Sequence, residues 1–341
     1  MSYFNRMFIA TGLVCVMTSF NASAADALPV HVGEFSQQAH KAYTRADGLS
    51  SEGILELVIG SEGALYAKGE KGVSVFDGER WTTASPEAVK KLPEPLRWYP
   101  SLAPLVDSRA TVRDVAQYGD EIAVAAQSGL YVGNGTEWEL VLPIQGDVRW
   151  APIDVRAVDY DENGHLWFAA PQGVGYRSKK GDWRLFTGKD GLPFSDFTCM
   201  SAGPKGVWFG TSNGAIRFAD NAFEFRQGRR WLINNSVQDI VVDSDGTAWI
   251  ATPSGVSCIY TAPTTFAKKA AFYLEEIDRY HRYTPLGYVS WAYMDAPGAK
   301  DTAKARYTDN DGHYTGKYLG MASLGYAVTK VPKLKADAKK A

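Results

Sequence analysis

Short runs of alternating apolar and polar residues recur along most of the chain, and a turn closes each one. Clear examples of these runs are residues 54–59, 112–116, 155–160 and 237–242. The sequences DENG (161–164) and DSDG (243–246) directly follow two of them, and both are typical of tight turns. Alternation with a period of two predicts half-buried β-strands. The pattern therefore predicts many short strands joined by short turns.

Three tryptophans mark a repeat within this pattern. Trp167, Trp208 and Trp249 are spaced by 41 residues, and a glycine follows each of them six residues later. The local sequences are GHLWFAAPQG, KGVWFGTSNG and GTAWIATPSG. Two weaker copies have Tyr66 and Ala123 at the tryptophan position, again six residues before a glycine. Four short strands in a unit of about 41 residues are typical of a propeller blade, so the copies predict an all-β propeller of about five blades.

The fifth unit lacks a last strand, because a helical pattern begins soon after Pro263. Residues 41–49 (KAYTRADGL) match residues 184–192 (RLFTGKDGL), which contain the last strand of the third unit. We therefore expect the N-terminal segment to complete the final blade, since this pairing removes an exposed sheet edge. Residues 82–110, which contain five prolines, are either a long loop or one decayed blade.

The G-x-L-W-x-x-T/A-x-x-G units and the D-G-L segments resemble the two-component regulator propeller repeat of secreted and periplasmic bacterial proteins. The resemblance covers residues 40–260 and is weakest in the second unit, where Ala123 replaces the aromatic residue. It implies a propeller of the kind that serves as an extracytoplasmic sensor module in hybrid histidine kinases. Related propellers occur in proteins that handle polysaccharides, including some carbohydrate lyases.

The first residues of the chain have the pattern of a secretory signal peptide. Arg6 precedes the apolar residues 7–20, and the sequence ASA (22–24) is the small-residue pattern that signal peptidase recognises. We expect residues 1–24 to be removed, residues 25–39 to form a lead, and the protein to be periplasmic or secreted. No later segment has eighteen consecutive apolar residues, so we expect no membrane span in the mature chain.

Composition bears on two further properties, nucleic-acid binding and disulfide formation. The chain has 36 Lys and Arg against 38 Asp and Glu, and this near-neutral balance gives no indication of nucleic-acid binding. Of the cysteines, Cys199 and Cys258 remain after the predicted cleavage, and both lie in apolar runs that favour free thiols over a disulfide.

The pattern becomes helical after the predicted propeller, which spans residues 40–261. Residues 266–283 and 314–328 carry apolar residues at helical spacing, and Pro332 opens a third, lysine-rich segment. Two or three helices bury their own apolar faces poorly. We therefore expect residues 262–341 to be a helical C-terminal region that is incomplete.

Most candidate site residues fall in this C-terminal region. His281 is a candidate acid or base, and Arg279 and Arg282 beside it are suited to orienting a carboxylate-bearing sugar. His313 is a second candidate, and an enzyme would use either His281 or His313 together with Tyr314. A lone histidine among charged residues is more often simply solvated, so these catalytic assignments are weak.

Two further sets of residues are candidates for ligand binding. Asp309 and Asp311 resemble the start of a calcium loop, but Gly320 stands where a bidentate carboxylate is required. We therefore expect no cofactor, with calcium as a minor alternative to a polar turn or a sugar-binding role. Trp98 and Tyr99, in the proline-rich insertion, form a candidate stacking platform for a sugar ring or, equally, an anchor for that loop.

Three functions are compatible with these residues. The first is an exported ligand- or glycan-binding, sensor-like module, and we favour it. The second is a polysaccharide lyase or hydrolase active on an acidic glycan, which requires a base, an acid and a cation in one cleft. The third is a scaffold that binds another protein. The repeat region supplies only His165 for acid–base chemistry, so an enzyme would depend on the helical region.

Overall fold

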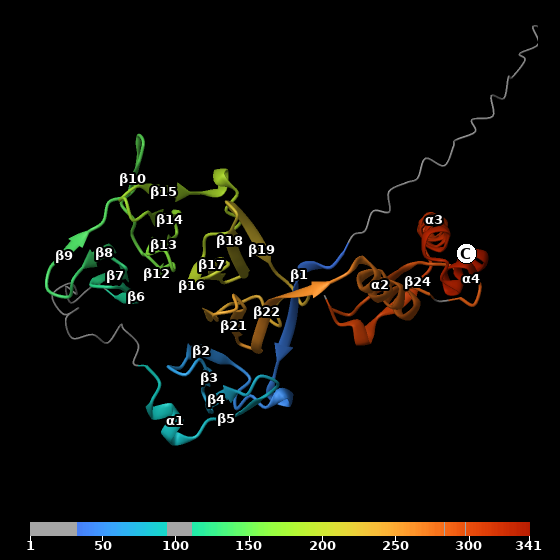
Figure 1. Ribbon diagram of the computed structural model, residues 1–341, viewed down its shortest axis with the longest axis horizontal. Helices are drawn as coiled ribbons and strands as arrows, with labels where there is room; N and C mark the ends of the chain where they lie inside the picture. The colour runs from blue at the N-terminus through green and yellow to red at the C-terminus, as the bar shows by residue number, and fades with distance from the viewer. Residues whose placement is uncertain (1–32, 94–110, 283, 297) are drawn as a thin grey trace, which may run out of the picture.

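The computed structural model describes residues 33–93, 111–282, 284–296 and 298–341. The predicted signal peptide, together with Trp98 and Tyr99, lies outside the described residues. Figure 1 shows antiparallel sheets arranged around a centre, with a helical region at one end of the molecule.

Among the described residues, five four-stranded antiparallel sheets make up most of the chain, and we number them in chain order. The first holds β2 (Ile54–Ile59), β3 (Leu65–Gly69), β4 (Gly72–Phe76) and β5 (Trp81–Thr83). The second holds β6 (Val112–Tyr118), β7 (Glu121–Ala126), β8 (Gly129–Gly133) and β9 (Trp138–Leu140). The third holds β12 (Ala157–Tyr160), β13 (Leu166–Ala170), β14 (Gly173–Arg177) and β15 (Trp183–Phe186).

The fourth sheet holds β16 (Phe197–Gly203), β17 (Gly206–Thr211), β18 (Gly214–Ala219) and β19 (Ala222–Arg226). The fifth holds β20 (Asp239–Val242), β21 (Ala248–Thr252), β22 (Gly255–Thr264) and β1 (Phe35–Tyr43). A short helix, α1 (Pro86–Lys90), follows the first sheet, and a hairpin of β10 (Ile144–Gln145) and β11 (Val148–Arg149) follows the second. The predicted all-β propeller architecture is confirmed.

The fifth sheet is built from both ends of the propeller segment. Strand β1 pairs with β22 along its whole length, from Phe35 opposite Thr264 to Tyr43 opposite Val256. The prediction that the N-terminal segment completes the last blade is therefore confirmed, although the strand begins at Phe35, ahead of the predicted residue 40.

The predicted match between residues 41–49 and 184–192 extends to atomic detail. Thr44 donates its backbone N–H to Asp47 at 2.8 Å, and Thr187 donates to Asp190 at 2.8 Å. Each turn ends in a glycine with a left-handed φ, 98° at Gly48 and 89° at Gly191. Because L side chains rarely adopt this conformation, glycine is the residue that suits both turns.

The repeat tryptophans are buried at equivalent positions of the second strand of their sheets. Trp167, Trp208 and Trp249 are 4%, 2% and 7% exposed, which confirms the predicted register. Trp167 also donates its indole N–H to Asp161 at 3.1 Å, and Trp249 donates to Asp243 at 2.9 Å. The aspartate that opens each turn therefore satisfies the polar atom of a buried ring.

Apolar clusters join neighbouring sheets. Phe168 lies in the cluster between the second and third sheets, and Phe209 lies in the one between the third and fourth. Trp208 belongs to the cluster shared by the fourth and fifth sheets, and Trp81 to the one shared by the fifth and first. No such cluster joins the first and second sheets within the described part of the chain. The number of blades in the ring therefore stays a prediction.

Hydrogen bonds link the first strands of neighbouring sheets at the same four junctions, and we call them the inter-sheet bonds. In each, a side-chain oxygen of one strand accepts a backbone N–H from the next sheet: Asp114 from Val158 (3.0 Å), Asp159 from Ala202 (2.8 Å), Ser201 from Val242 (3.2 Å) and Asp239 from Leu57 (2.7 Å). Desolvation raises the pKa of Asp114 to about 7 and that of Asp159 to about 6. The side chains of Asp114 and Asp159 are partly buried.

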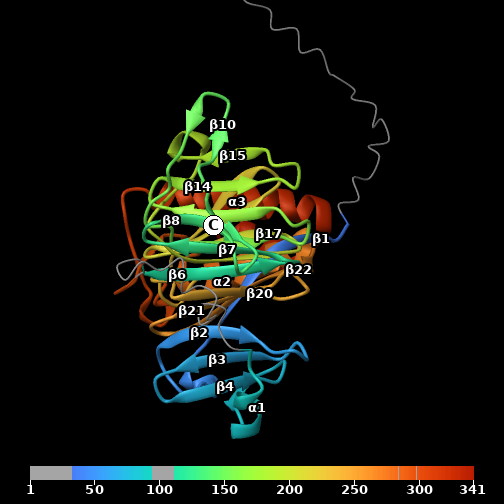
Figure 2. The same ribbon diagram turned by 90° about the vertical axis from the view of Figure 1, so that its left-hand side faces the viewer.

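The helical region lies beside the fifth sheet, at the end of the molecule away from the second sheet (Figures 1 and 2). It contains α2 (Phe266–Tyr280), α3 (Asp311–Thr329) and α4 (Pro332–Lys340), with a small sheet of β23 (Trp291–Tyr293) and β24 (Lys304–Arg306). Its own core is small and consists of Val289, Tyr318, Ala322 and Leu334 with partly buried neighbours. In the part of the chain that the structure describes, no helix has the length and hydropathy needed to cross a membrane.

Candidate functional site

The helical region contains an open pocket of about 480 Å³ between α2, β23 and α3. Its walls are mainly apolar and aromatic, and three of its polar groups are His281, Ser290 and Lys317. Trp291 and Tyr314 provide the exposed aromatic surface, and the buried Tyr318 lies behind them in the core of the helical region. The structure thus brings together His281 and Tyr314, two of the residues predicted from the sequence, across 33 residues of chain.

His281 is fixed at the end of α2 by three hydrogen bonds. Its backbone N–H donates to Ile277 at 3.0 Å, and its carbonyl accepts from the Ser290 N–H at 2.9 Å. Its ring Nδ1 lies 2.8 Å from the carbonyl oxygen of Ser290. A carbonyl only accepts, so Nδ1 carries the hydrogen and Nε2 of the neutral ring is left with its lone pair. His281 is therefore positioned as a proton acceptor or hydrogen-bond acceptor.

The Ser290 hydroxyl is held by two acceptors, Asp311 and the backbone carbonyl of Arg306. The Ser290 hydroxyl lies 2.6 Å from Oδ1 of Asp311, and the Thr308 hydroxyl donates to the same oxygen at 3.0 Å. Ser290 bonds His281 through its carbonyl rather than its hydroxyl. This arrangement is not that of a nucleophile activated by a base, which requires a bond from the hydroxyl to the histidine.

Arg282 and its partners hold the three helices together. It donates to Asp278 at 2.7 Å and to the Gly287 carbonyl at 2.6 Å, and its guanidinium lies 4.5 Å from the centroid of the Tyr318 ring. Lys333 on α4 donates to Asp278 at 2.8 Å. The network therefore links α2 to α4 through charged hydrogen bonds and to α3 through the contact of Arg282 with the Tyr318 ring.

The remaining predicted residues lie apart from the pocket. Arg279, Asp309 and His313 are exposed, and none of them lines it. Within the described residues, no three His, Cys, Asp or Glu side chains are grouped so as to hold a metal ion. Cys199 and Cys258 are free thiols.

Of the residues that line the pocket, only His281 and Tyr314 were predicted as site residues, and the two most relevant to ligand binding that were missed are Trp291 and Lys317. Trp291 lies outside the 41-residue register in a short apolar run, which is a signal that could have drawn attention to it. Lys317 is one of several lysines near the C-terminus, and only its place one turn after Tyr314 on α3 separates it from the others.

Comparison with known proteins concerns the propeller. Residues 232–254 match the sequence model of a family described as two component regulator propeller. No curated protein matches the chain.

Solved structures with a similar fold share little sequence with this chain. The extracellular domain of a protein named as a hybrid two component system, BT3049 from B. thetaiotaomicron, is 15% identical, with a TM-score of 0.39; the match covers 68% of this chain and 37% of that one. A protein of unknown function from Bacteroides thetaiotaomicron is 10% identical, with a TM-score of 0.45 and coverage of 67% and 77%. Virginiamycin B lyase from Staphylococcus aureus is 11% identical, with a TM-score of 0.39 and coverage of 66% and 99%.

This chain therefore spans well under half of the BT3049 domain, and at these identities the activities of such proteins are not transferred to it. The matched segment, residues 232–254, contains the third of the tryptophans that define the 41-residue repeat. The resemblance of this chain to the two-component regulator propeller repeat family is thus confirmed.

Proposed function

We propose that this chain is an exported, sensor-like module that binds a glycan in the pocket of its helical region. The observation that carries the proposal is the pair of exposed aromatic rings, Trp291 and Tyr314, beside an open pocket with few polar groups. Aromatic faces pack against the apolar faces of sugar rings, and a small number of polar groups then fixes the orientation of the ligand. Export rests on the signal-peptide pattern at residues 1–24.

A glycan-array screen with residues 25–341 tests this function. Each glycan that binds is then titrated into the protein, and the change in tryptophan fluorescence gives its affinity. Trp291→Ala and Tyr314→Ala should each weaken binding about ten-fold or more, because each removes a ring that lines the pocket. Tyr273→Ala is the matched control, since Tyr273 is an exposed aromatic residue on α2 that does not line the pocket. Unchanged affinity in both pocket variants would show that the ligand binds elsewhere.

A polysaccharide lyase is the second candidate, and one observation favours it. His281, Tyr314 and Lys317 line the same pocket and match the base, the acid and the cation that cleavage of a uronate-containing chain requires. A lyase would produce unsaturated uronate, which absorbs ultraviolet light. Absorbance that rises with the wild-type chain and stays flat with His281→Gln would favour the enzyme, whereas binding without any rise favours the module.

A further inference from the structure

A cationic and aromatic surface lies where the fourth sheet, the fifth sheet and the helical region meet. We call it the junction patch, and it consists of Arg229, Arg230, Trp231, His40 and Lys300. The Arg230 guanidinium lies 5.5 Å from the centroid of the Trp231 ring, and the His40 ring lies 6.2 Å from it. A Cβ added at Gly298, two residues before Lys300, would touch the Arg229 side chain, so the loop of the helical region packs on this arginine.

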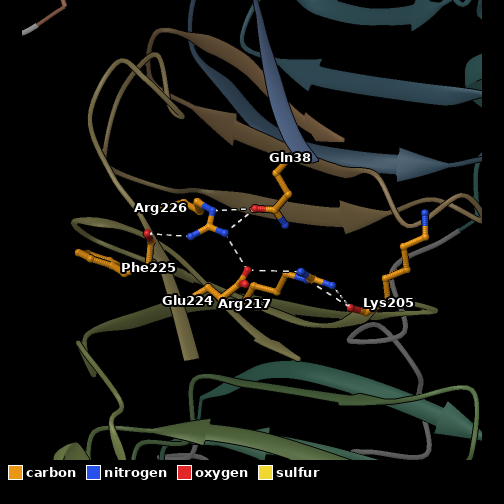
Figure 3. Close-up of polar contacts among 6 residues, drawn as sticks. All are labelled: Gln38, Lys205, Arg217, Glu224, Phe225 and Arg226. Atoms are coloured by element: carbon orange, nitrogen blue, oxygen red, sulfur yellow. Dashed lines mark hydrogen bonds and ion pairs between the residues drawn. The ribbon is translucent and has the colours of Figure 1, made fainter. Parts of the chain in front are cut away.

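Arg226, which lies against Trp231, belongs to a network of hydrogen bonds on the propeller side. Figure 3 shows this network. The Arg226 guanidinium lies 4.7 Å from the Trp231 ring centroid, and it donates to Gln38 on β1 at 2.8 Å. It also donates to Glu224 at 2.7 Å, and Arg217 donates to the same carboxylate at 3.3 Å. Glu224 is therefore already shared by two arginines and is not free to neutralise others.

The junction patch carries more positive than negative charge. Arg229 and Arg230 are exposed, and within the described residues no ion pair involves either of them. Lys300 pairs with Glu276 on α2. The pKa of His40 is lowered, first by partial desolvation and then by the charges of Arg230 and Lys300. The charges of Arg230 and Lys300 both act on His40, so positive charge gathers around this ring, and a bound oxyanion removes the repulsion between the charges.

We propose that the junction patch binds a carboxylate or sulfate group of an acidic polysaccharide, with a sugar ring beside Trp231. Guanidinium groups present paired N–H donors that match the two oxygens of such an anion. The part of the Trp231 indole that stays exposed beside Arg226 and Arg230 adds apolar surface for the sugar ring.

Lys300 contacts Glu276, and the next residue of α2, Ile277, lines the pocket described above. The junction patch and the pocket therefore adjoin the same turn of α2. The proposal rests on the glycan-binding function and adds the chemical class of the ligand.

The test compares three probes on residues 25–341: polygalacturonate, dextran sulfate and neutral dextran. The double variant Arg229→Gln/Arg230→Gln should lose about ten-fold or more in affinity for the acidic probes, because each lost guanidinium removes charge-assisted hydrogen bonds. Lys180→Gln/Lys189→Gln is the matched control, since it removes two exposed cations on the third sheet and the turn that follows it. Wild-type binding should also weaken as salt is raised.

Equal losses in the two double variants, or no loss in the patch variant, would overturn the proposal, as would a wild-type chain that binds neither acidic probe. Melting temperatures that match the wild type show that each variant is folded. Trp291→Ala separates the junction patch from the pocket. If Trp291→Ala binds acidic probes normally and the arginine variant does not, the junction patch holds and the pocket function fails. If only Trp291→Ala loses binding, the junction patch is refuted and the pocket function holds.

Discussion

The inter-sheet bond made by Asp114 should make the stability of the propeller depend on pH. The pKa of this carboxyl is raised to about 7 by desolvation, with further contributions from the charges of Asp159 and Asp239, against 3.8 for an exposed aspartate. Between these values the folded chain holds a proton that the unfolded chain has released. The contribution of the Asp114 carboxyl group to the free energy of unfolding is therefore fully present below about pH 4 and is lost as the pH rises through 7.

The size of the effect follows from the shift. A change from 3.8 to about 7 corresponds to about 4 kcal/mol in the free energy of unfolding, at about 1.4 kcal/mol per pH unit. Asp114→Asn cannot titrate, so it should lack this dependence. The two oxygens of the Asp114 carboxyl group accept from Val115 and Val158, whereas an amide has one acceptor oxygen, so the substitution should also cost about 1–3 kcal/mol that does not depend on pH.

The assay is urea unfolding of both chains from pH 4 to pH 8, followed by tryptophan fluorescence. At pH 4 the wild type should have the larger free energy of unfolding. Between pH 4 and pH 8 the free energy of unfolding of the wild type should fall by about 4 kcal/mol relative to that of Asp114→Asn. Asp245→Asn, in an exposed turn, is the control and should follow the wild type. A difference between wild type and Asp114→Asn that stays constant from pH 4 to pH 8 would refute the reasoning.

Three further predictions concern packing. Trp208→Ala should cost about 3–5 kcal/mol, since the ring is 2% exposed between two sheets; a loss below about 1 kcal/mol in urea unfolding would contradict its place in the core. Deleting residues 25–46 removes β1 and exposes β22, so light scattering should detect aggregation, and a monomeric variant with unchanged melting would disprove this role. Amides of α3 should exchange hydrogen faster than those of β17 and β21, because the helical core is small; equal protection would contradict this ranking.

The parts of the fold that depend on local sequence were predictable. Trp167, Trp208 and Trp249 each precede a glycine by six residues, and this spacing predicts a strand followed by a tight turn. The strand and the turn are neighbours in the sequence, so a local pattern is enough to predict them. The match between Thr44 and Thr187 predicted the role of β1, because the same turn follows both strands. Periodicity predicts such features well, since it reflects contacts within one sheet.

Features that join distant segments were not predictable in the same way. The bond from Val158 to Asp114 depends on the offset between two sheets, which no local pattern records. The sequence paired Tyr314 with either His281 or His313, and the packing of α3 on α2 places His281, and not His313, in the same pocket as Tyr314. Arg282 was predicted to bind ligand, yet the structure engages it with Asp278. The side-chain partners of these residues lie on different helices and strands, so spacing alone did not identify them.

The composition of the fifth sheet has a consequence for the order of folding. Strand β1 is made first during synthesis, but its partner β22 ends at Thr264, more than two hundred residues later. Closing so long a loop costs chain entropy that is recovered only when the intervening sheets are formed, and contacts of high sequence separation form slowly. The first four sheets need only neighbouring sequence and can form while synthesis continues. The pairing of β1 with β22 is then the last step of propeller assembly, and until it occurs β1 remains an unpaired strand.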